Sequence, residues 1–269
     1  MLYPIGIQNF EDIRRGGYVY VDKTGLIYKL AATGKYYFLS RPRRFGKSLL
    51  VSTMEAYFQG KKELFEGLAV ASLEKDWVEY PVLHFDLSGA SYTDMEALND
   101  KIGRQLETLE SRFGVVKKYK TFSVRFDNLI ECAFNKTGRQ VVILIDEYDK
   151  PVIDNLDRPE LQDKMREMLR GFYGVMKGKD GYIRFGFLTG VTKIGKMSVF
   201  SDLNNPADIS MDKEYYDICG VSESDLAEYF AESVMELAEA NGLSEEECRQ
   251  RLALMYDGYH FHPKAAGVY

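Results

Sequence analysis

Short apolar runs alternate with stretches of helical periodicity through the first 211 residues of the chain. The apolar runs predict strands at 36–39, 81–87, 141–146, 182–190 and 207–211. The stretches between them predict helices at 25–30, 48–59, 92–111, 122–135 and 159–177. Such alternation is typical of a parallel sheet with helices on both faces. The pattern therefore predicts an α/β fold, a three-layer sandwich around a mostly parallel sheet.

The remainder of the chain has a different pattern. Residues 193–206 are expected to form a loop, and helical periodicity returns at 222–240 and 244–255 without a further strand. We therefore predict two parts: a core of residues 1–211 and a helical, lid-like subdomain of residues 212–269, which we expect to be truncated.

Composition narrows the class of protein. The 269 residues are 45% hydrophobic and 28% charged, which is ordinary for a globular protein, and no apolar run approaches the ~20 residues of a membrane span. A net charge of −6 disfavours a protein that coats nucleic acid. The three cysteines are far apart and have no metal-binding spacing, so we expect reduced thiols and a cytoplasmic location.

The first candidate chemistry lies between the strand at 36–39 and the helix that follows it. Ser40-Arg41-Pro42-Arg43-Arg44-Phe45-Gly46-Lys47-Ser48 matches the end of the phosphate-binding pattern G-x-x-x-x-G-K-[ST], in the strand–loop–helix context that this P-loop requires. Lys47 would reach the β- and γ-phosphates, and the Ser48 hydroxyl would hold Mg²⁺. The predicted nucleotide-binding residues of this loop are Pro42, Arg43, Arg44, Phe45, Gly46, Lys47, Ser48 and Leu49.

One position departs from the pattern, because Arg41 stands where the first glycine is expected. An L-residue held at positive φ would cost on the order of 1–2 kcal/mol. We therefore predict that the loop takes another path and that Arg41 points outward.

Two later strands also end in polar residues. Val141 to Ile145 are all β-branched or leucine, which indicates a strand buried on both faces, and Asp146 and Glu147 follow it. In a P-loop protein Asp146 would contact Mg²⁺ and Glu147 would act as a general base toward water. Thr189, at the end of the next strand, would be a polar sensor near the γ-phosphate. The acids could instead cap a helix.

The segment before the P-loop strand has two interpretations. Residues 18–24 could be an ordinary strand that leads into a helix beside the P-loop strand. Alternatively Val21, Asp22 and Lys23 could lie over the base of a bound nucleotide. Guanine specificity is unsupported, because neither Asn135-Lys136-Thr137-Gly138 nor Thr192-Lys193-Ile194-Gly195 has the aspartate of a guanine signature.

Several of these strings together resemble a bacterial family of predicted AAA-ATPase-like proteins. They are Ser40–Leu50, Tyr20-Val21-Asp22-Lys23-Thr24, Ile145-Asp146-Glu147-Tyr148-Asp149, Leu188-Thr189-Gly190-Val191-Thr192 and Tyr256-Asp257-Gly258-Tyr259. The arginine-rich loop is also similar to that of signal-transducing ATPases with numerous domains. The resemblance implies a P-loop NTPase fold, adenine against Tyr20–Lys23, and in many members a fused PD-(D/E)xK nuclease-like domain.

The sequence thus predicts an ATP- and Mg²⁺-binding ATPase coupled to an unidentified effector. A nucleotide-gated switch with little turnover is the alternative. Nucleic acid would be involved only indirectly, and a second copy of the chain could supply an arginine finger.

Overall fold

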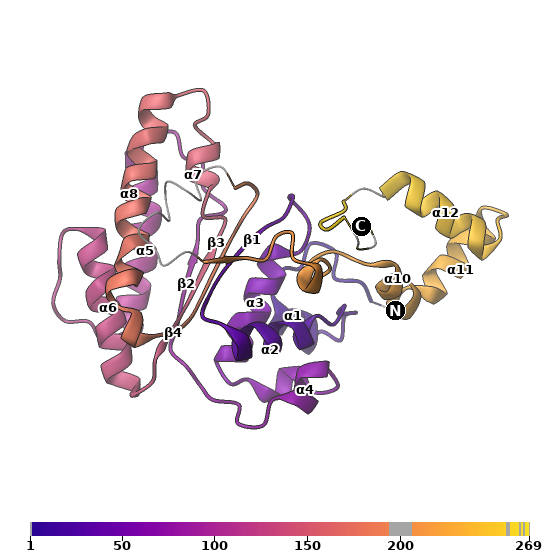
Figure 1. The fold of residues 1–269 in the computed structure, drawn as a ribbon, viewed down its shortest axis with the longest axis horizontal. Helices are drawn as coiled ribbons and strands as arrows, with labels where there is room; N and C mark the ends of the chain where they lie inside the picture. Colours follow the sequence, from indigo (N-terminus) through magenta and orange to yellow (C-terminus); the bar gives the residue numbers. More distant parts are fainter. Residues whose placement is uncertain (1, 194–205, 257–258, 264, 266, 269) are drawn as a thin grey trace.

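The structure is a computed structural model that describes residues 2–193, 206–256, 259–263, 265, 267 and 268. Its centre is a sheet of five parallel strands in the order β2-β3-β4-β1-β5 (Figure 1). The strands are β1 (Tyr36–Ser40), β2 (Val82–Asp86), β3 (Val141–Asp146), β4 (Ile183–Gly190) and β5 (Ala207–Asp208). The predicted α/β class and parallel sheet are confirmed. Most of the expected loop at 193–206 lies outside the described residues.

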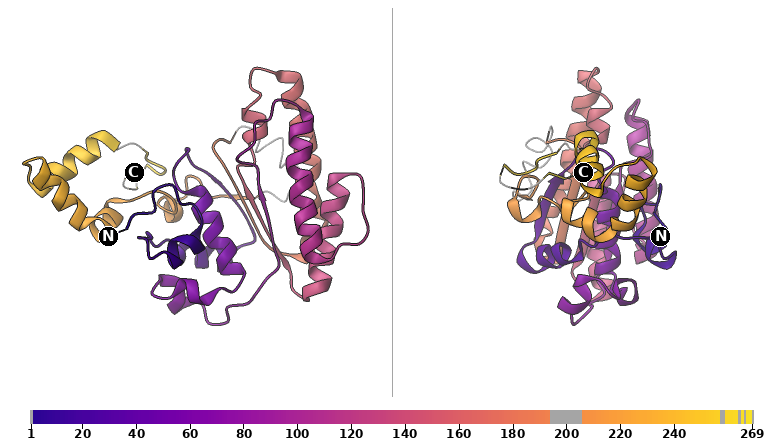
Figure 2. Two further views of the ribbon diagram at one scale, coloured as in Figure 1. Left: turned by 180° about the vertical axis from the view of Figure 1, so that it is seen from behind. Right: turned by 90° about the vertical axis from the view of Figure 1, so that its right-hand side faces the viewer.

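Helices cover both faces of the sheet, which gives three layers (Figures 1 and 2). One layer holds α5 (Met95–Phe113), α6 (Phe122–Thr137) and α8 (Pro159–Gly178), with the short α7 (Lys150–Ile153) beside α8. The other holds α1 (Phe10–Arg15), α2 (Thr24–Thr33), α3 (Lys47–Phe58) and α4 (Ala69–Leu73). Single-turn helices lie at η1 (Lys62–Phe65), η2 (Asp180–Tyr182) and η3 (Lys213–Tyr215).

Strand β3 shows why this sequence builds three layers. Its side chains alternate between the two cores: Val141, Ile143 and Ile145 pack with α5, α6 and α8, whereas Val142 and Leu144 pack on the other side. Successive side chains of a strand point to opposite faces, so an unbroken apolar run needs apolar partners on both.

The strand register brings the functional candidates to one edge of the sheet. Ser40 pairs with Gly190, and Asp86 pairs with Asp146. Ile145 pairs with Leu188, so Asp146 and Thr189 follow at the same level. The carboxyl ends of parallel strands therefore meet where open α/β sheets place their ligands.

The segment before the first central strand forms no strand. Residues 18–23 run as irregular chain between α1 and α2, so the ordinary-strand interpretation is wrong. The segment nevertheless packs closely, because Tyr20 is buried in the core of the α1–α4 layer and its hydroxyl lies 3.2 Å from that of Thr53.

The C-terminal part extends away from the sheet (Figure 1). It contains α10 (Glu223–Tyr229), α11 (Ala231–Ala240) and α12 (Glu245–Tyr256), so the predicted helix at 222–240 is interrupted at Phe230. Val234, Ala238 and Cys248 form a small core of their own, whereas the sheet core continues as far as Cys219. The division at residues 211 and 212 stays a prediction.

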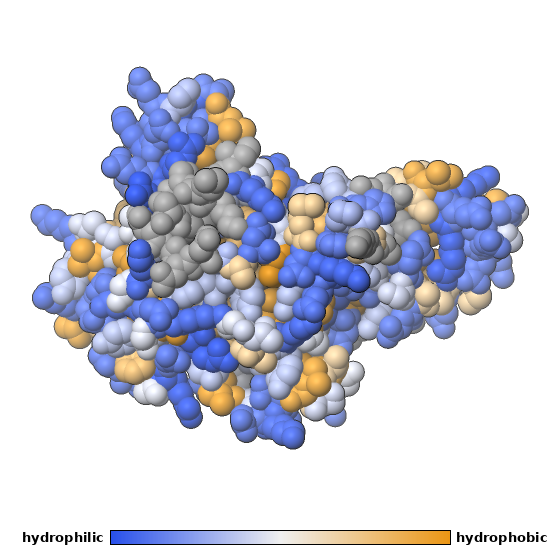
Figure 3. Space-filling view, in the orientation of Figure 1, coloured by the Kyte–Doolittle hydropathy of each residue, from blue (hydrophilic) through white to orange (hydrophobic). Residues whose placement is uncertain are grey.

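Hydrophilic residues cover much of the face shown in Figure 3, with small apolar areas between them. In the described part of the chain, no helix is both long and apolar enough to cross a membrane.

Candidate nucleotide-binding site

The loop after β1 ends at the start of α3. Gly46, with φ +81°, is the N-cap of this helix, and no side chain caps it. The first backbone N–H groups of a helix lack intrahelical acceptors, so an uncapped start attracts an anion. The exposed side chains of Arg43 and Arg44 add positive charge at the rim of the loop. The loop and the uncapped start of α3 therefore offer backbone N–H groups and positive charge to an anion.

The position of Arg41 differs from our expectation. The loop does take another path, because its left-handed residues are Arg44, with φ +70°, and Gly46, and not Arg41. However, Arg41 does not point outward: only 1% of the residue is exposed. Its guanidinium donates to four backbone carbonyl oxygens, those of residues 40, 210, 215 and 216, which makes burial tolerable.

Lys47 is buried against the loop that precedes it. Its Nζ donates to the carbonyl oxygens of Arg41 at 3.0 Å and Pro42 at 2.9 Å, and 5% of the residue is exposed. Burial lowers the pKa of Lys47, while the nearby charges of Asp146 and Glu147 act in the opposite direction. Lys47 is thus a desolvated cation held at the mouth of the loop.

Asp146 and Glu147 form a carboxylate pair opposite Lys47. Asp146 is 3% exposed, and burial raises its pKa, although a hydrogen bond from Ser48 opposes that rise. Burial also raises the pKa of Glu147, and the adjacent Asp146 adds to the effect. Glu147 is held in the left-handed region at φ +52°, and such strain gathers at functional sites.

Thr189 lies on β4, between the P-loop strand and the strand of Asp146. Its side chain is fully buried, and its Oγ1 has no hydrogen-bond partner among the described residues. Its carbonyl accepts from the backbone N–H of Tyr148, which ties the end of β4 to the loop after Glu147. An orphaned hydroxyl at this edge fits a polar ligand, because an unsatisfied buried group costs free energy.

Asp149 belongs to the string that follows β3, and the sequence pattern predicted no role for it. Its buried carboxylate accepts from the backbone N–H groups of Val191 and Thr192 and from the Thr192 hydroxyl at 3.0 Å. A Cβ at Gly190 would lie 2.4 Å from this carboxylate, so only glycine fits there. Asp149 therefore fixes the loops after β3 and β4 to each other. The sequence feature that could have pointed to this role is the position of Asp149, three residues after Asp146.

An apolar pocket of about 490 Å³ adjoins the P-loop. Its lining includes Val19, Val21, Phe45, Leu49, Ile218 and Phe230. Lys23, Arg44 and Gly46 line it too, so the pocket is continuous with the start of α3. A flat, largely apolar group of the size of a nucleobase suits such a lining.

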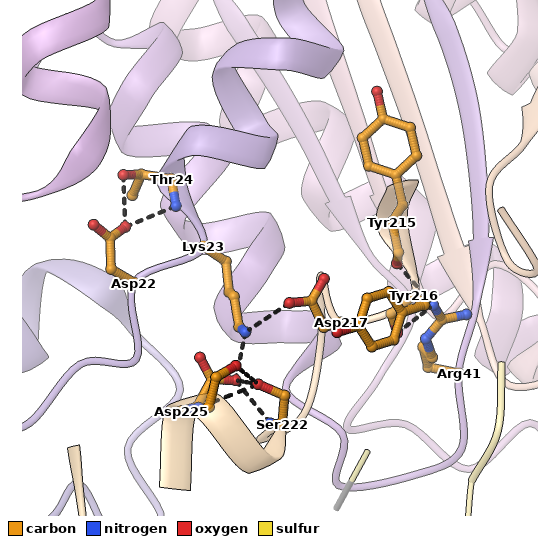
Figure 4. A network of polar contacts seen from close by, with 10 residues as sticks. Asp22, Lys23, Thr24, Arg41, Tyr215, Tyr216, Asp217, Ser222 and Asp225 are labelled. Carbon is orange, nitrogen blue, oxygen red and sulfur yellow. Dashed lines mark hydrogen bonds and ion pairs between the residues drawn. The ribbon is translucent and has the colours of Figure 1, made fainter. Parts of the chain in front are cut away.

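Within the segment 21–23, the three side chains have different surroundings, and Figure 4 shows those of Asp22 and Lys23. Val21 and Lys23 line the pocket. The Asp22 carboxylate instead accepts from Thr24 and from the backbone N–H of Ala69, which fixes the starts of α2 and α4. Lys23 forms a buried ion pair with Asp225 of α10 at 2.6 Å. No local pattern could reveal a pair separated by 202 residues.

Comparison with known proteins places the chain in a family. The model of the family "Predicted AAA-ATPase" matches residues 4–200, and the chain belongs to this family. An uncharacterised protein in the vnfD 5′ region of Azotobacter chroococcum mcd 1 is 43% identical over 264 residues. That alignment covers 97% of this chain and 49% of the relative, so the chain spans about half the length of the relative. No solved structure matches. Membership of this family supports nucleotide binding in general.

Proposed function

We propose that this chain binds ATP with Mg²⁺ and hydrolyses it. The observation that carries the proposal is the group of desolvated charges at the carboxyl edge of the sheet. Lys47, Asp146 and Glu147 act on one another electrostatically, yet within the described residues none of them makes an ion pair. Burying charges without matched partners is costly, and a ligand that supplies both negative oxygens and a cation would satisfy them.

Each residue of the loop then has a definite task. The N–H groups at the start of α3 and the Nζ of Lys47 would hold phosphate oxygens, with Arg43 and Arg44 at the rim. Ser48 and Asp146 already share a hydrogen bond, and their oxygens are the type of ligand that Mg²⁺ prefers. The bound cation would neutralise charge that develops on the phosphates.

Glu147 is the proposed general base. A carboxylate whose pKa is raised is a stronger base than an ordinary glutamate while it remains ionised near neutral pH. It would accept a proton from the attacking water, and the Thr189 hydroxyl would donate to an oxygen of the γ-phosphate. Val21, Phe45 and Leu49 would contact the adenine in the apolar pocket. An effector attached to the chain or bound by it would use the hydrolysis cycle.

The test separates hydrolysis from simple binding. We expect Glu147→Gln to lower phosphate release by about 10²–10⁴-fold, the usual contribution of a positioned base, and to retain ATP binding. Glu236→Gln, on the exposed face of α11, is the matched control and should release phosphate at the wild-type rate. ATP binding by the wild type with no phosphate release would instead favour a nucleotide-gated switch.

A further inference from the structure

Arg41 connects three parts of the molecule that are distant in sequence. Its guanidinium donates to the carbonyl oxygens of the neighbouring Ser40 at 3.0 Å and of Ser210 at 2.6 Å. It also donates to the carbonyl oxygens of Tyr215 at 3.1 Å and Tyr216 at 3.2 Å (Figure 4). Its own carbonyl accepts from Nζ of Lys47 at 3.0 Å. One residue therefore holds both the chain that leads to the C-terminal helices and the lysine of the P-loop.

The Arg41 guanidinium also contacts the C-terminal segment, by which we mean the described residues 259–263, 265, 267 and 268. The guanidinium carbon lies 3.8 Å from the ring centroid of Phe261, which is a close cation–π distance. Phe261 also packs edge-on against Phe45 of the P-loop, with ring centroids 5.6 Å apart. Tyr259 stacks on Phe261 and contacts Phe45 as well.

The C-terminal segment is in turn attached to the start of α10. Val268 forms antiparallel bridges with Tyr259 and with Ser222, the N-cap of α10. Asp225 of the same helix holds Lys23, which lines the apolar pocket. The segment thus contacts the P-loop, and α10 holds a residue that lines the pocket.

The position of the Arg41 side chain depends on a small number of contacts. Burial lowers its pKa to about 10, and within the described residues no carboxylate forms an ion pair with it. Its buried Nε has no partner among the described residues. The cation is therefore held by backbone carbonyl oxygens and by the face of Phe261, so loss of that ring would leave part of it poorly packed.

We propose that Arg41 is a positioning residue that couples the C-terminal segment to the P-loop, so that docking of Phe261 on Arg41 and Phe45 strengthens nucleotide binding. This inference rests on the proposed function. The coupling acts through two contacts at the loop: the Arg41 carbonyl holds Lys47, and Phe45 lines the pocket. Release of Phe261 loosens both contacts. A partner that draws the C-terminal segment away would consequently promote nucleotide release.

Calorimetric titration of the 269-residue chain with ADP and Mg²⁺ tests this coupling. We expect Phe261→Leu to weaken ADP binding by about three- to thirtyfold, the range from exposed to desolvated cation–π contacts. Phe261→Tyr, which keeps the ring, should bind as the wild type does. In an Arg41→Lys background, where the planar fork is lost, Phe261→Leu should have no further effect on ADP affinity.

Two further measurements separate coupling from general destabilisation. Leu254→Ala, at an exposed position of α12, should not change ADP affinity. Because coupling is reciprocal, ADP should protect the backbone amides of residues 259–262 from hydrogen exchange by the same factor by which Phe261 strengthens ADP binding.

The outcomes distinguish failure of the coupling from failure of the proposed nucleotide binding. ADP binding by Phe261→Leu that is equal to or tighter than that of the wild type would overturn the coupling alone, even if the variant melts at a lower temperature. If the wild type bound neither ADP nor ATP, the proposed function would fail, and the coupling would fail with it.

Discussion

Two groups of buried or partly buried charges lie on this fold and are built differently. Arg125 of α6 and Glu110 of α5 form a two-pronged ion pair, with both N–O distances 2.8 Å, and their side chains are 12% and 11% exposed. At the carboxyl edge of the sheet, Lys47 donates to backbone carbonyl oxygens, while Asp146 and Glu147 are adjacent like charges.

The comparison shows how burial alone can mislead. In the helical pair, geometry satisfies both charges, and the hydrogen bonds that Arg125 donates to Glu110 raise the pKa of Arg125. At the sheet edge, burial lowers the pKa of Lys47 and raises those of the two carboxyl groups, so each charge is disfavoured. A satisfied pair is typical of structure, whereas disfavoured charges are typical of a ligand site.

Breaking the helical pair should have the largest effect on stability. We expect Arg125→Met to lower the free energy of unfolding by about 3–5 kcal/mol, because Glu110 is left buried and unpaired. Removing both charges, as Arg125→Met with Glu110→Leu, should recover most of that loss. Urea unfolding measures both effects. A double variant as unstable as the single one would contradict this interpretation, and ADP affinity should not change in either folded variant.

Replacing Asp146 should stabilise the fold, the opposite of the effect expected for Arg125. The folded-state pKa of Asp146 is raised, so its ionisation opposes folding, and this destabilisation appears as pH rises through the unfolded and then the folded pKa. Asp146→Asn should therefore raise the melting temperature of the nucleotide-free protein at neutral pH. The gain should shrink as pH falls through the folded pKa. A lower melting temperature at neutral pH would show that the carboxylate stabilises the fold.

The pH range in which the protein hydrolyses ATP should be narrower than it would be if Glu147 and Lys47 had ordinary pKa values. Glu147 must be ionised to accept a proton, and its pKa lies above the ordinary 4.5, so activity should fall at a higher pH on acidification. Lys47 must be protonated, and its pKa lies below the ordinary 10.5, so binding should fall earlier on the alkaline side. Phosphate release and ADP affinity, each measured against pH, check the two limits. An ADP affinity that stays constant up to pH 10.5 would contradict the alkaline limit.

The sequence predicted the fold and the sheet edge because both depend on local patterns. The run Val141 to Ile145 predicts a buried strand by itself, and a motif places Lys47 at a helix start. Parallel strands then require that Asp146 and Thr189 lie at the same edge.

The remaining contacts depend on pairs that are distant along the chain. Arg41 contacts Ser210, 169 residues away, whereas an outward-pointing guanidinium was predicted from the backbone conformation of the loop alone. The loop places its strain at Arg44 rather than at position 41, which no propensity indicates. The strand interpretation of residues 18–24 was wrong for a related reason, since aromatic side chains fit a core without strand pairing.

Calorimetric titration of ATP and GTP with Mg²⁺, on the wild type and Lys47→Ala, tests the central claim most directly. We expect the wild type to bind ATP more tightly than GTP and to lose affinity without Mg²⁺. Lys47→Ala should lose most of the binding while retaining its melting temperature, because the buried cation is disfavoured in the fold. Equal heats for the wild type and Lys47→Ala would contradict the assignment of the P-loop.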